Sequence, residues 1–274
     1  MSGRALKLRT YPGFMLASLG CMILLYAPML VISIYSFNAT RSITEWGGFS
    51  LAWYAKVFAN PEIQRATVNS LVIAISASTL ATTFALLAAI AMVRGRGFRG
   101  RGAAYALINL PLMVPEIISA VGSLIFFLAI GINLGIMTVM IAHTVFCIPF
   151  AYLPISARLQ GIESYYDYAA RDLYANNWQS FRYVLAPMMF PGVLSGYMLS
   201  FIISLDDFII TNMVAGPGAT TLPLAIYGMV RIGFTPEINA ISTLMLLASL
   251  IFVTLSYLAG RSGRQLKPAK GAMK

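Results

Sequence analysis

Six stretches of this sequence are apolar over a length that can cross a lipid bilayer. A membrane-spanning helix needs about 20 apolar residues, and its backbone hydrogen bonds are all satisfied within the segment. Only 10% of the 274 residues are charged and 59% are hydrophobic, whereas soluble domains carry about 25% charged residues. The sequence therefore predicts an all-α membrane protein with six transmembrane helices, at about 13–37, 67–93, 103–130, 134–153, 188–212 and 238–259.

The basic residues indicate how these spans are oriented. Of the 19 lysines and arginines, 15 fall on one side of the predicted membrane. Positively charged loops stay on the cytoplasmic side, so we expect both termini, the turn at 94–102 and the loop after the fourth span to be cytoplasmic. The net charge of +10 then reflects topology, and we expect no nucleic-acid partner. The 15 residues are Arg4, Lys7, Arg9, Arg94, Arg96, Arg99, Arg101, Arg158, Arg171, Arg182, Arg261, Arg264, Lys267, Lys270 and Lys274.

Two basic segments have alternative interpretations. The turn at 94–102, RGRGFRGRG, is either a stop-transfer turn or a patch that binds anionic lipid, and we favour the turn. The N-terminus resembles a secretory signal, but the first apolar run is too long and lacks a small-residue cleavage site, so we expect a retained span. We divide the chain into an N-terminal span with an outer segment (1–66), a membrane core (67–260) and a basic cytoplasmic tail (261–274).

The motifs of several enzyme classes are absent from the sequence. It contains no G-x-x-x-x-G-K-[ST] loop for nucleotide hydrolysis, no G-x-S-x-G, no H-E-x-x-H and no C-x-x-C. Cys21 and Cys147 both lie inside apolar runs, and a single histidine, His143, cannot form a metal site by itself. We therefore predict no catalytic residue, no cofactor and no metal ion, and we expect His143 to hydrogen-bond a neighbouring helix.

Two segments are expected on the outer side of the membrane. Residues 38–66 are rich in aromatic side chains, which suit a short surface helix or an interfacial belt. The loop at 215–240 is rich in Gly, Pro and Thr, and its apolar stretch 222–230 predicts a short helix or a re-entrant segment. Pro236 then begins the sixth span, because proline fits the first turn of a helix.

The third span is interrupted by Pro111 and Pro115, and Glu116 follows directly. Proline frees backbone carbonyl groups, which at membrane depth is tolerated where the helix faces protein or water. Glu116 therefore either lies near a helix end beside an ordinary kink or lines a cavity. Both interpretations fit the sequence equally well.

The fifth span combines a stripe of small residues with two carboxylates. A stripe of this kind lets another helix approach closely, and Asp207 continues it while Asp206 points about 100° away. A carboxylate at the centre of a span costs about 2.5–3.5 kcal/mol on insertion scales. The pair is either solvated near the outer interface or faces an internal pathway and meets a cation, and we favour the pathway. The stripe consists of Gly192, Gly196, Ser200 and Ser204.

A long polar loop at 156–191 separates the fourth and fifth spans. It shows two amphipathic helix patterns joined by the Asn-Asn pair at 176–177, and Pro187 is expected to end the second. Asp167 and Arg171 form an i,i+4 pair in the first. A simple connector needs no apolar stripe, so we expect this loop to dock another protein. The stripe consists of Tyr165, Ala169 and Leu173 in the first pattern and Trp178, Phe181 and Leu185 in the second.

Within this loop the string YAARDLYA at 168–175, followed by Leu185-Ala186-Pro187, resembles the EAA loop of ABC importer permeases. The resemblance covers the whole chain and is closest to the spermidine/putrescine branch of the second-permease type. The other matching segments are Ser36-Phe37-Asn38, Leu205-Asp206-Asp207, Gly216-Pro217, Leu222-Pro223-Leu224 with Ile226-Tyr227, and Pro236-Glu237-Ile238-Asn239-Ala240.

The resemblance implies a type I ABC importer permease fold in a bacterial cytoplasmic membrane, with cytoplasmic coupling helices between the fourth and fifth spans (loop 156–187). It implies a subunit that forms half of the pathway for a small cationic solute, and we expect a polyamine such as putrescine or spermidine. The implied partners are a second permease subunit, which we expect to be a different chain, two ATPase subunits that hydrolyse ATP, a periplasmic substrate-binding protein, and membrane lipid.

The resemblance also assigns roles to residues. The expected pathway residues are Asp206, Asp207 and Glu116. The residues expected to couple to the ATPase are Tyr168, Ala169, Ala170, Arg171, Asp172, Leu173 and Tyr174. On the outer loop, the residues expected to contact the binding protein are Tyr227, Arg231 and Glu237. The chain departs from the family pattern where Tyr168 replaces a glutamate and Tyr174 replaces a glycine. That glycine permits a positive φ, so we expect the Asn-Asn pair at 176–177 to make the bend instead.

Three other functions compete with this interpretation. An importer of the same class could carry an opine-like, amino-acid-like or aminophosphonate solute. An ion-coupled secondary transporter could use Asp206 and Asp207, but such proteins usually contain inverted repeats, and residues 1–130 do not resemble 131–274. A membrane-embedded enzyme would need a nucleophile beside a base, which the sequence lacks. We favour the polyamine importer permease.

Overall fold

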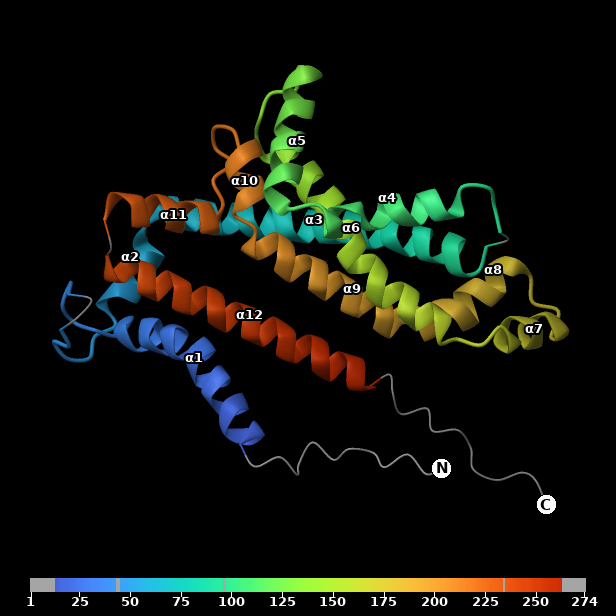
Figure 1. The fold of residues 1–274 in the computed structure, drawn as a ribbon, viewed down its shortest axis with the longest axis horizontal. Helices are drawn as coiled ribbons and strands as arrows, with labels where there is room; N and C mark the ends of the chain where they lie inside the picture. The colour runs from blue at the N-terminus through green and yellow to red at the C-terminus, as the bar shows by residue number, and fades with distance from the viewer. Residues whose placement is uncertain (1–12, 43–44, 96, 234, 263–274) are drawn as a thin grey trace. The chain divides into compact units, whose positions relative to one another are not determined.

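The computed structural model describes residues 13–42, 45–95, 97–233 and 235–262, and these residues form an almost entirely helical chain (Figure 1). Within them, the one β-bridge joins Asn38 and Phe49. The basic N-terminal residues Arg4, Lys7 and Arg9 and the predicted tail beyond Ser262 lie outside the described residues.

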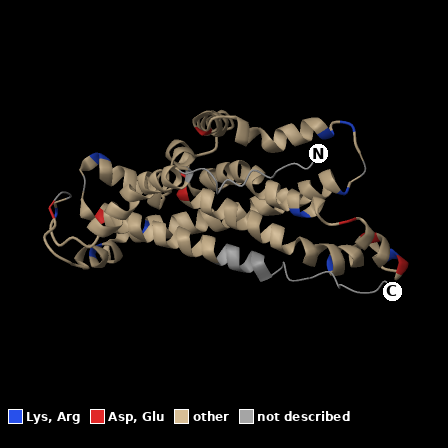
Figure 2. Cartoon of the chain, turned by 60° about the horizontal axis from the view of Figure 1, so that its bottom comes forward, with Lys and Arg blue, Asp and Glu red and all other residues tan. Residues whose placement is uncertain are grey.

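The helices confirm the all-α prediction. In the described part of the chain, five helical stretches are long and apolar enough to cross a membrane, and α4 and α5 together make a sixth if the bent pair counts as one span. Charged residues occur mainly in links and near helix ends (Figure 2). The helices are α1 (Phe14–Tyr35), α2 (Ala52–Ala59), α3 (Pro61–Val93), α4 (Arg101–Met113), α5 (Glu116–Ala129), α6 (Ile136–Gln160), α7 (Tyr165–Asp172), α8 (Asn177–Gln179), the π-helix η2 (Ser180–Leu185), α9 (Ala186–Asp206), α10 (Ile209–Val214), α11 (Leu222–Ile232) and α12 (Pro236–Ser262).

The chain divides into two compact units. The smaller unit contains Met1–Asn60 and Met229–Leu247, and therefore α1, α2 and the first part of α12. The larger unit contains Pro61–Gly228 and Ala248–Lys274, and therefore α3 to α10 and most of α11. Helices α11 and α12 agree with the prediction of a short helix that begins at Leu222 and a long apolar helix that begins at Pro236.

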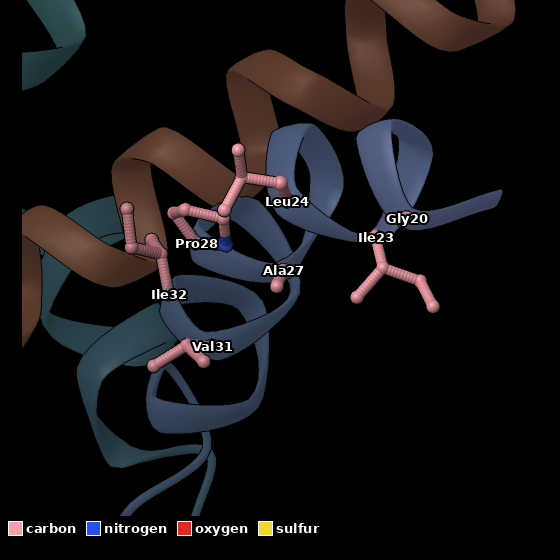
Figure 3. Close-up of a pocket in the computed structure, with 7 residues that line it drawn as sticks. All are labelled: Gly20, Ile23, Leu24, Ala27, Pro28, Val31 and Ile32. Carbon is pink, nitrogen blue, oxygen red and sulfur yellow. The ribbon is translucent and has the colours of Figure 1, made fainter. Parts of the chain in front are cut away.

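In the smaller unit, the apolar side chains of α1 are exposed along almost its whole length. One side carries an apolar groove at Gly20, Ala27 and Pro28 (Figure 3). An apolar helix that is exposed all round is stable in lipid or against another apolar helix, but not in water. This exposure agrees with the predicted first span, and α1 is long and apolar enough to cross a membrane.

The outer segment of the smaller unit is organised by the buried side chain of Asn38. Its amide donates to the carbonyl oxygens of Ser42 at 2.9 Å and Glu45 at 2.7 Å, and its oxygen accepts from the N–H of Gly47 at 2.8 Å. The indole of Trp53, on α2, donates to the Asn38 carbonyl at 2.7 Å. This helix is the short surface helix that the aromatic composition predicted.

In the larger unit, α3, α6 and α9 pack side by side (Figure 1). The small residues of α9 face α6, as predicted. A Cβ added to Gly192 would lie 2.5 Å from Cβ of Arg158, and one added to Gly196 would lie 2.8 Å from the carbonyl oxygen of Ala151. Real side chains do not approach so closely, so only glycine allows this spacing between α6 and α9.

The third span is broken, but not at both prolines. Pro111 lies inside α4, whereas Pro115 precedes α5, and the two helices meet at an angle of 109°. Proline disfavours a helical conformation for the residue before it, and Val114 is accordingly extended, with φ −93° and ψ 133°. Glu116 is therefore the first residue of a new helix.

The prediction of a continuous fifth span at 188–212 is wrong at both ends. Helix begins earlier, at Asn177, and runs to Asp206 through α8, η2 and α9. Pro187 therefore does not end a helix; it lies in the first turn of α9, where a missing N–H is tolerated. Asp207 is extended, with φ −63° and ψ 126°, so it does not continue the helical stripe, and α10 begins only at Ile209.

The bend after α7 is made by Tyr174, not by the Asn-Asn pair. Tyr174 has φ +61°, and Asn176 is extended and caps α8, accepting from the N–H of Gln179 at 2.8 Å. The N–H of Tyr174 bonds the carbonyl of Arg171 and that of Ala175 bonds the carbonyl of Ala170, at 2.9 and 3.1 Å. These two bonds define a Schellman motif, which places a left-handed residue at this position whatever its side chain.

Replacing Tyr174 by glycine should stabilise the end of α7. The left-handed conformation costs a non-glycine residue about 1–2 kcal/mol, and the Tyr174 side chain is 97% exposed, so little packing is lost. Amide hydrogen exchange of Tyr174→Gly should slow at positions 174 and 175 by about fivefold or more. Tyr168→Gly is the matched control, because this exposed tyrosine lies inside α7, where glycine destabilises by about 1 kcal/mol. Faster exchange in both variants would contradict the assignment.

Replacing Gly196 by leucine should separate α6 from α9 and lower the free energy of unfolding by about 1–3 kcal/mol or more. Thermal unfolding of the purified protein in detergent measures this loss. Gly122→Leu is the control, because a Cβ at Gly122 on α5 meets nothing within 4 Å. Equal losses in the two variants would show that the α6–α9 contact is not as close as described.

Candidate functional site

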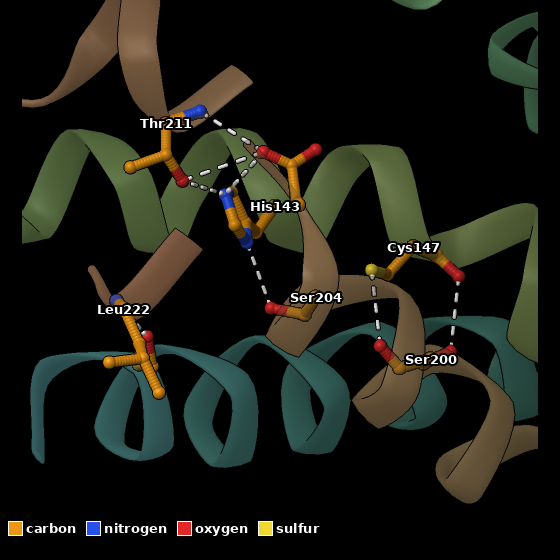
Figure 4. A network of polar contacts seen from close by, with 8 residues as sticks. His143, Cys147, Ser200, Ser204, Thr211 and Leu222 are labelled. Carbon is orange, nitrogen blue, oxygen red and sulfur yellow. Dashed lines mark hydrogen bonds and ion pairs between the residues drawn. The ribbon is translucent and has the colours of Figure 1, made fainter. Parts of the chain in front are cut away.

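A buried polar network joins α6, α9 and α10 in the larger unit (Figure 4). The imidazole of His143, on α6, lies between the ends of the other two helices. Its Nδ1 is 2.8 Å from Oγ of Ser204, and its Nε2 is 3.0 Å from Oγ1 of Thr211. The prediction that His143 bonds a neighbouring helix is therefore confirmed, and it bonds two.

Asp207 completes this network from the break between α9 and α10. Its Oδ1 accepts from the backbone N–H of Thr211 at 3.1 Å and from the Thr211 hydroxyl at 3.4 Å, and it lies 3.4 Å from Nε2 of His143. A carboxylate only accepts hydrogen bonds, so these contacts require a proton on Nε2. The Ser204 hydroxyl can then donate to Nδ1, so both ring nitrogens have hydrogen-bond partners.

The second oxygen of Asp207, Oδ2, is buried and has no hydrogen-bond partner among the described residues. The carboxyl group of Glu116, at the start of α5, interacts electrostatically with Asp207. Asp206 immediately precedes Asp207 in the chain, and its side chain is exposed. Leaving a buried charged oxygen unpaired is costly. The site therefore contains a buried acidic oxygen that lies beside a second carboxyl group, that of Glu116.

The sequence identified the carboxylates but not the groups that hold them. Ser204 was recognised only as a small residue in the α9 stripe, and Thr211 was not singled out, although it follows Asp207 by four residues. One helical turn away, Ser200 Oγ is 3.3 Å from the Cys147 carbonyl, so the same two helices are bonded again. Among the described residues, no three His, Cys, Asp or Glu side chains are grouped to hold a metal ion.

The outer loop before α11 is fixed to α3 in the larger unit. The amide of Asn69 donates to the carbonyl oxygens of Gly218 and Thr220, both at 2.9 Å. The N–H of Leu222 donates to Oγ of Ser70 at 2.8 Å. These bonds hold the start of α11 in place relative to the break at Asp207.

The three residues predicted to contact a binding protein fall in different parts of the structure. Tyr227, on α11 in the larger unit, packs on the ring of Phe208 with 4.5 Å between ring centroids, beside the α9–α10 break. Arg231 lies in the last turn of α11 and Glu237 in the first turn of α12, both in the smaller unit.

At the other end of the larger unit, α7 presents mostly exposed side chains. Ala170 is its buried residue, and the predicted stripe faces outward, with Tyr165 and Leu173 exposed and Ala169 half-buried. Exposed coupling-loop residues with large side chains are Tyr168, Leu173 and Tyr174, with Trp178 beyond them.

The predicted ion pair between Asp167 and Arg171 is wrong. Asp167 Oδ2 instead accepts from Arg94 at 3.1 Å, and Arg171 contacts Asn177 Oδ1 at 3.3 Å. An exposed i,i+4 pair contributes only about 0.2–0.5 kcal/mol, which a partly buried guanidinium with several acceptors outweighs.

Comparisons with known proteins agree with this architecture. Residues 81–269 match the family described as binding-protein-dependent transport system inner membrane component. The chain is 40% identical over 237 residues to the spermidine/putrescine transport system permease protein PotC of Haemophilus influenzae, covering 86% of this chain and 92% of that protein. It is 38% identical over 248 residues to the putrescine transport system permease protein PotI of Escherichia coli, covering 88% of each.

Among solved structures, the chain resembles a chain of the bacterial alginate ABC transporter in complex with an alginate pentasaccharide-bound periplasmic protein. The TM-score is 0.63 at 15% identity, with 94% of this chain and 95% of that chain covered. This likeness confirms the predicted fold, that of a type I ABC importer permease. The chain therefore belongs to the family of binding-protein-dependent transport system inner membrane components, and it is a multi-pass inner-membrane permease subunit of the polyamine branch rather than an enzyme.

Proposed function

We propose that this chain forms half of the membrane pathway of an ATP-driven importer for a small cationic solute, with putrescine and spermidine as the expected solutes. The observation that carries the proposal is the identity of 36–40% over most of the chain to permeases named for these two polyamines. The acidic groups at the helix breaks agree with it, because an intramembrane carboxylate marks a pathway for cations more often than a structural site.

In this proposal, Asp206 and Asp207 both contribute to binding an ammonium group of the solute. Asp206 is exposed and free to meet the solute. Asp207 is buried and fixed by His143 and Thr211, and its Oδ2 has no hydrogen-bond partner among the described residues. Glu116 adds a third carboxyl group from the break in the neighbouring span. A diamine carries positive charge at both ends, so several acidic groups suit it better than one.

The ATPase subunits are proposed to bind at one end of the larger unit, where α7 is exposed. We place the ATPase subunits at the exposed face of α7, with contacts at Tyr168, Leu173 and Tyr174 and the remaining coupling residues Ala169, Ala170, Arg171 and Asp172 supporting that face. The π-helix and α8 extend the same surface. The positive-inside rule puts this end, and both termini, in the cytoplasm.

The outer end would receive solute from a periplasmic binding protein, through Tyr227, Arg231 and Glu237. The related alginate transporter was solved with such a protein bound. A second permease subunit, expected to be a different chain, completes the pathway, and the exposed apolar surface of α1 faces either that subunit or lipid.

Removing the charge of either aspartate should impair polyamine uptake. For Asp206→Asn and Asp207→Asn we expect the KM for labelled putrescine to rise about 10- to 100-fold, the range for losing a charged hydrogen bond. Competition with spermidine, and with an amino acid and an aminophosphonate, identifies the solute class. Glu163→Gln is the control, since it removes an exposed carboxylate that precedes α7. Unchanged putrescine uptake in both aspartate variants would refute the pathway assignment.

His143 should act through Asp207. His143→Leu removes the donor that fixes Oδ1, so we expect uptake to fall about as far as in Asp207→Asn, and the double variant to be no worse than either single one. Cys147→Ala, on the same face of α6 and buried against Ser200, should leave the KM within about twofold. Additive losses in the double variant would mean that the two side chains act independently.

A further inference from the structure

Arg94 reaches from the end of α3 into the loop that begins α7. Its guanidinium donates to Oδ2 of Asp167 at 3.1 Å, to Oγ of Ser164 at 3.2 Å and to the carbonyl oxygen of Ile162 at 2.6 Å. The three acceptors lie 73, 70 and 68 residues further along the chain. A basic residue that only stops translocation of a span needs no acceptors of this kind.

The contact is partly buried at both partners. The side chain of Arg94 is 15% exposed and that of Asp167 is 29% exposed. Arginine presents its donors in a rigid planar fork, so several bonds to one segment fix orientation as well as position. The other described arginines of this link do not reach the loop: Arg99 is exposed, and Arg101 donates to the carbonyl of Met92.

Asp167 also contacts the helix that leads into α9. Its Oδ1 is 3.5 Å from Oγ of Ser180, the first residue of η2. One carboxylate therefore joins the end of α3, the start of α7 and the beginning of the α9 stretch. No other described residue of α7 forms an ion pair with another helix.

Directly beside this junction lies an apolar cluster shared by α3, α6 and α9. Met92 of α3, Leu159 of α6 and Met189 of α9 are buried in it, together with Ile162, whose carbonyl Arg94 holds. Close-packed interiors transmit displacement rather than absorb it. A shift of α7 is therefore passed to α3 through Arg94 and to the cluster through Ile162.

We propose that Arg94 is a positioning residue for energy coupling, which transmits movement of the ATPase-docking helix α7 to α3 and so to the pathway. This inference rests on the proposed docking of ATPase subunits at α7. It adds a residue outside the coupling loop to the machinery, and it gives Asp167 an intramolecular partner. Without Arg94, α7 would still bind the ATPase, but its movement would not be passed on in full.

The test uses the complete importer in proteoliposomes, with the second permease, the ATPase subunits and the binding protein. Putrescine uptake and ATP hydrolysis are measured together, and the ratio of solute imported to ATP hydrolysed is compared among variants. For Arg94→Leu we expect this ratio to fall about tenfold, within the range of coupling between distant sites, while the ATPase still co-purifies. Arg94→Lys keeps the positive charge but loses the planar guanidinium, so its ratio of solute imported to ATP hydrolysed should lie between that of Arg94→Leu and that of the unaltered protein.

A charge swap and a neighbouring arginine serve as controls. Arg94→Asp combined with Asp167→Arg should recover a large part of the ratio lost in Arg94→Asp alone, because the ion pair is rebuilt with reversed polarity. Arg99→Leu removes a charge from the same link and should leave the ratio unchanged.

The outcomes separate this inference from the proposed function. If no ATPase co-purifies with the unaltered chain, the proposed function fails. If the ATPase co-purifies and Arg94→Leu and Arg94→Lys lower only the yield of complex, with the ratio unchanged, Arg94 is merely structural and the inference is overturned. The inference is also overturned if the Arg94→Asp and Asp167→Arg double variant recovers none of the ratio lost in Arg94→Asp. Where Arg94→Leu does not fold, Arg94→Lys and the swap decide by the same ratio.

Discussion

The close approach of α6 and α9 is the contact on which the rest of the larger unit depends. In lipid, apolar side chains gain little by leaving the bilayer, so helices associate through tight packing and interhelical hydrogen bonds. The stripe on α9 supplies both. Gly192 and Gly196 bring the backbones together at one end, and Ser200 and Ser204 bond Cys147 and His143 at the other. A larger residue at either glycine would move His143 away from the break that it holds.

That break gives two adjacent carboxylates different surroundings. Unpaired backbone is tolerated at membrane depth only where protein or water satisfies it, and here the break between α9 and α10 is enclosed by α5 and α6. Asp207 turns inward and is fixed by His143 and Thr211, whereas Asp206 remains exposed. In the proposed function, this places one fixed acidic group beside one that is accessible to the cationic solute.

The sequence predicted what depends on local length and period. The apolar runs located most of the long helices, the four-residue spacing predicted the close helix contact, and a lone histidine in a span implied a cross-helix bond. It could not predict that Asp207 leaves the helix or that Glu116 comes near it, because both depend on packing between distant segments. The bend at Tyr174 was missed for another reason. A positive φ is unfavourable for tyrosine, so the sequence argued against a bend there, but the two backbone hydrogen bonds of the Schellman motif outweigh this cost. From the sequence, Arg94 was interpreted only as one of the basic residues that orient the spans, because its hydrogen-bond partners lie far along the chain.

In the proposed function the chain forms half of the pathway, lacks the P-loop motif of a nucleotide hydrolase, and takes its energy from ATPase subunits docked at α7. The most direct test is accumulation of labelled putrescine in proteoliposomes that contain this chain with its second permease, with and without the ATPase subunits and ATP. The account predicts accumulation only when the ATPase and ATP are both present and the binding protein delivers the solute. Accumulation against a gradient by this polypeptide alone would contradict it.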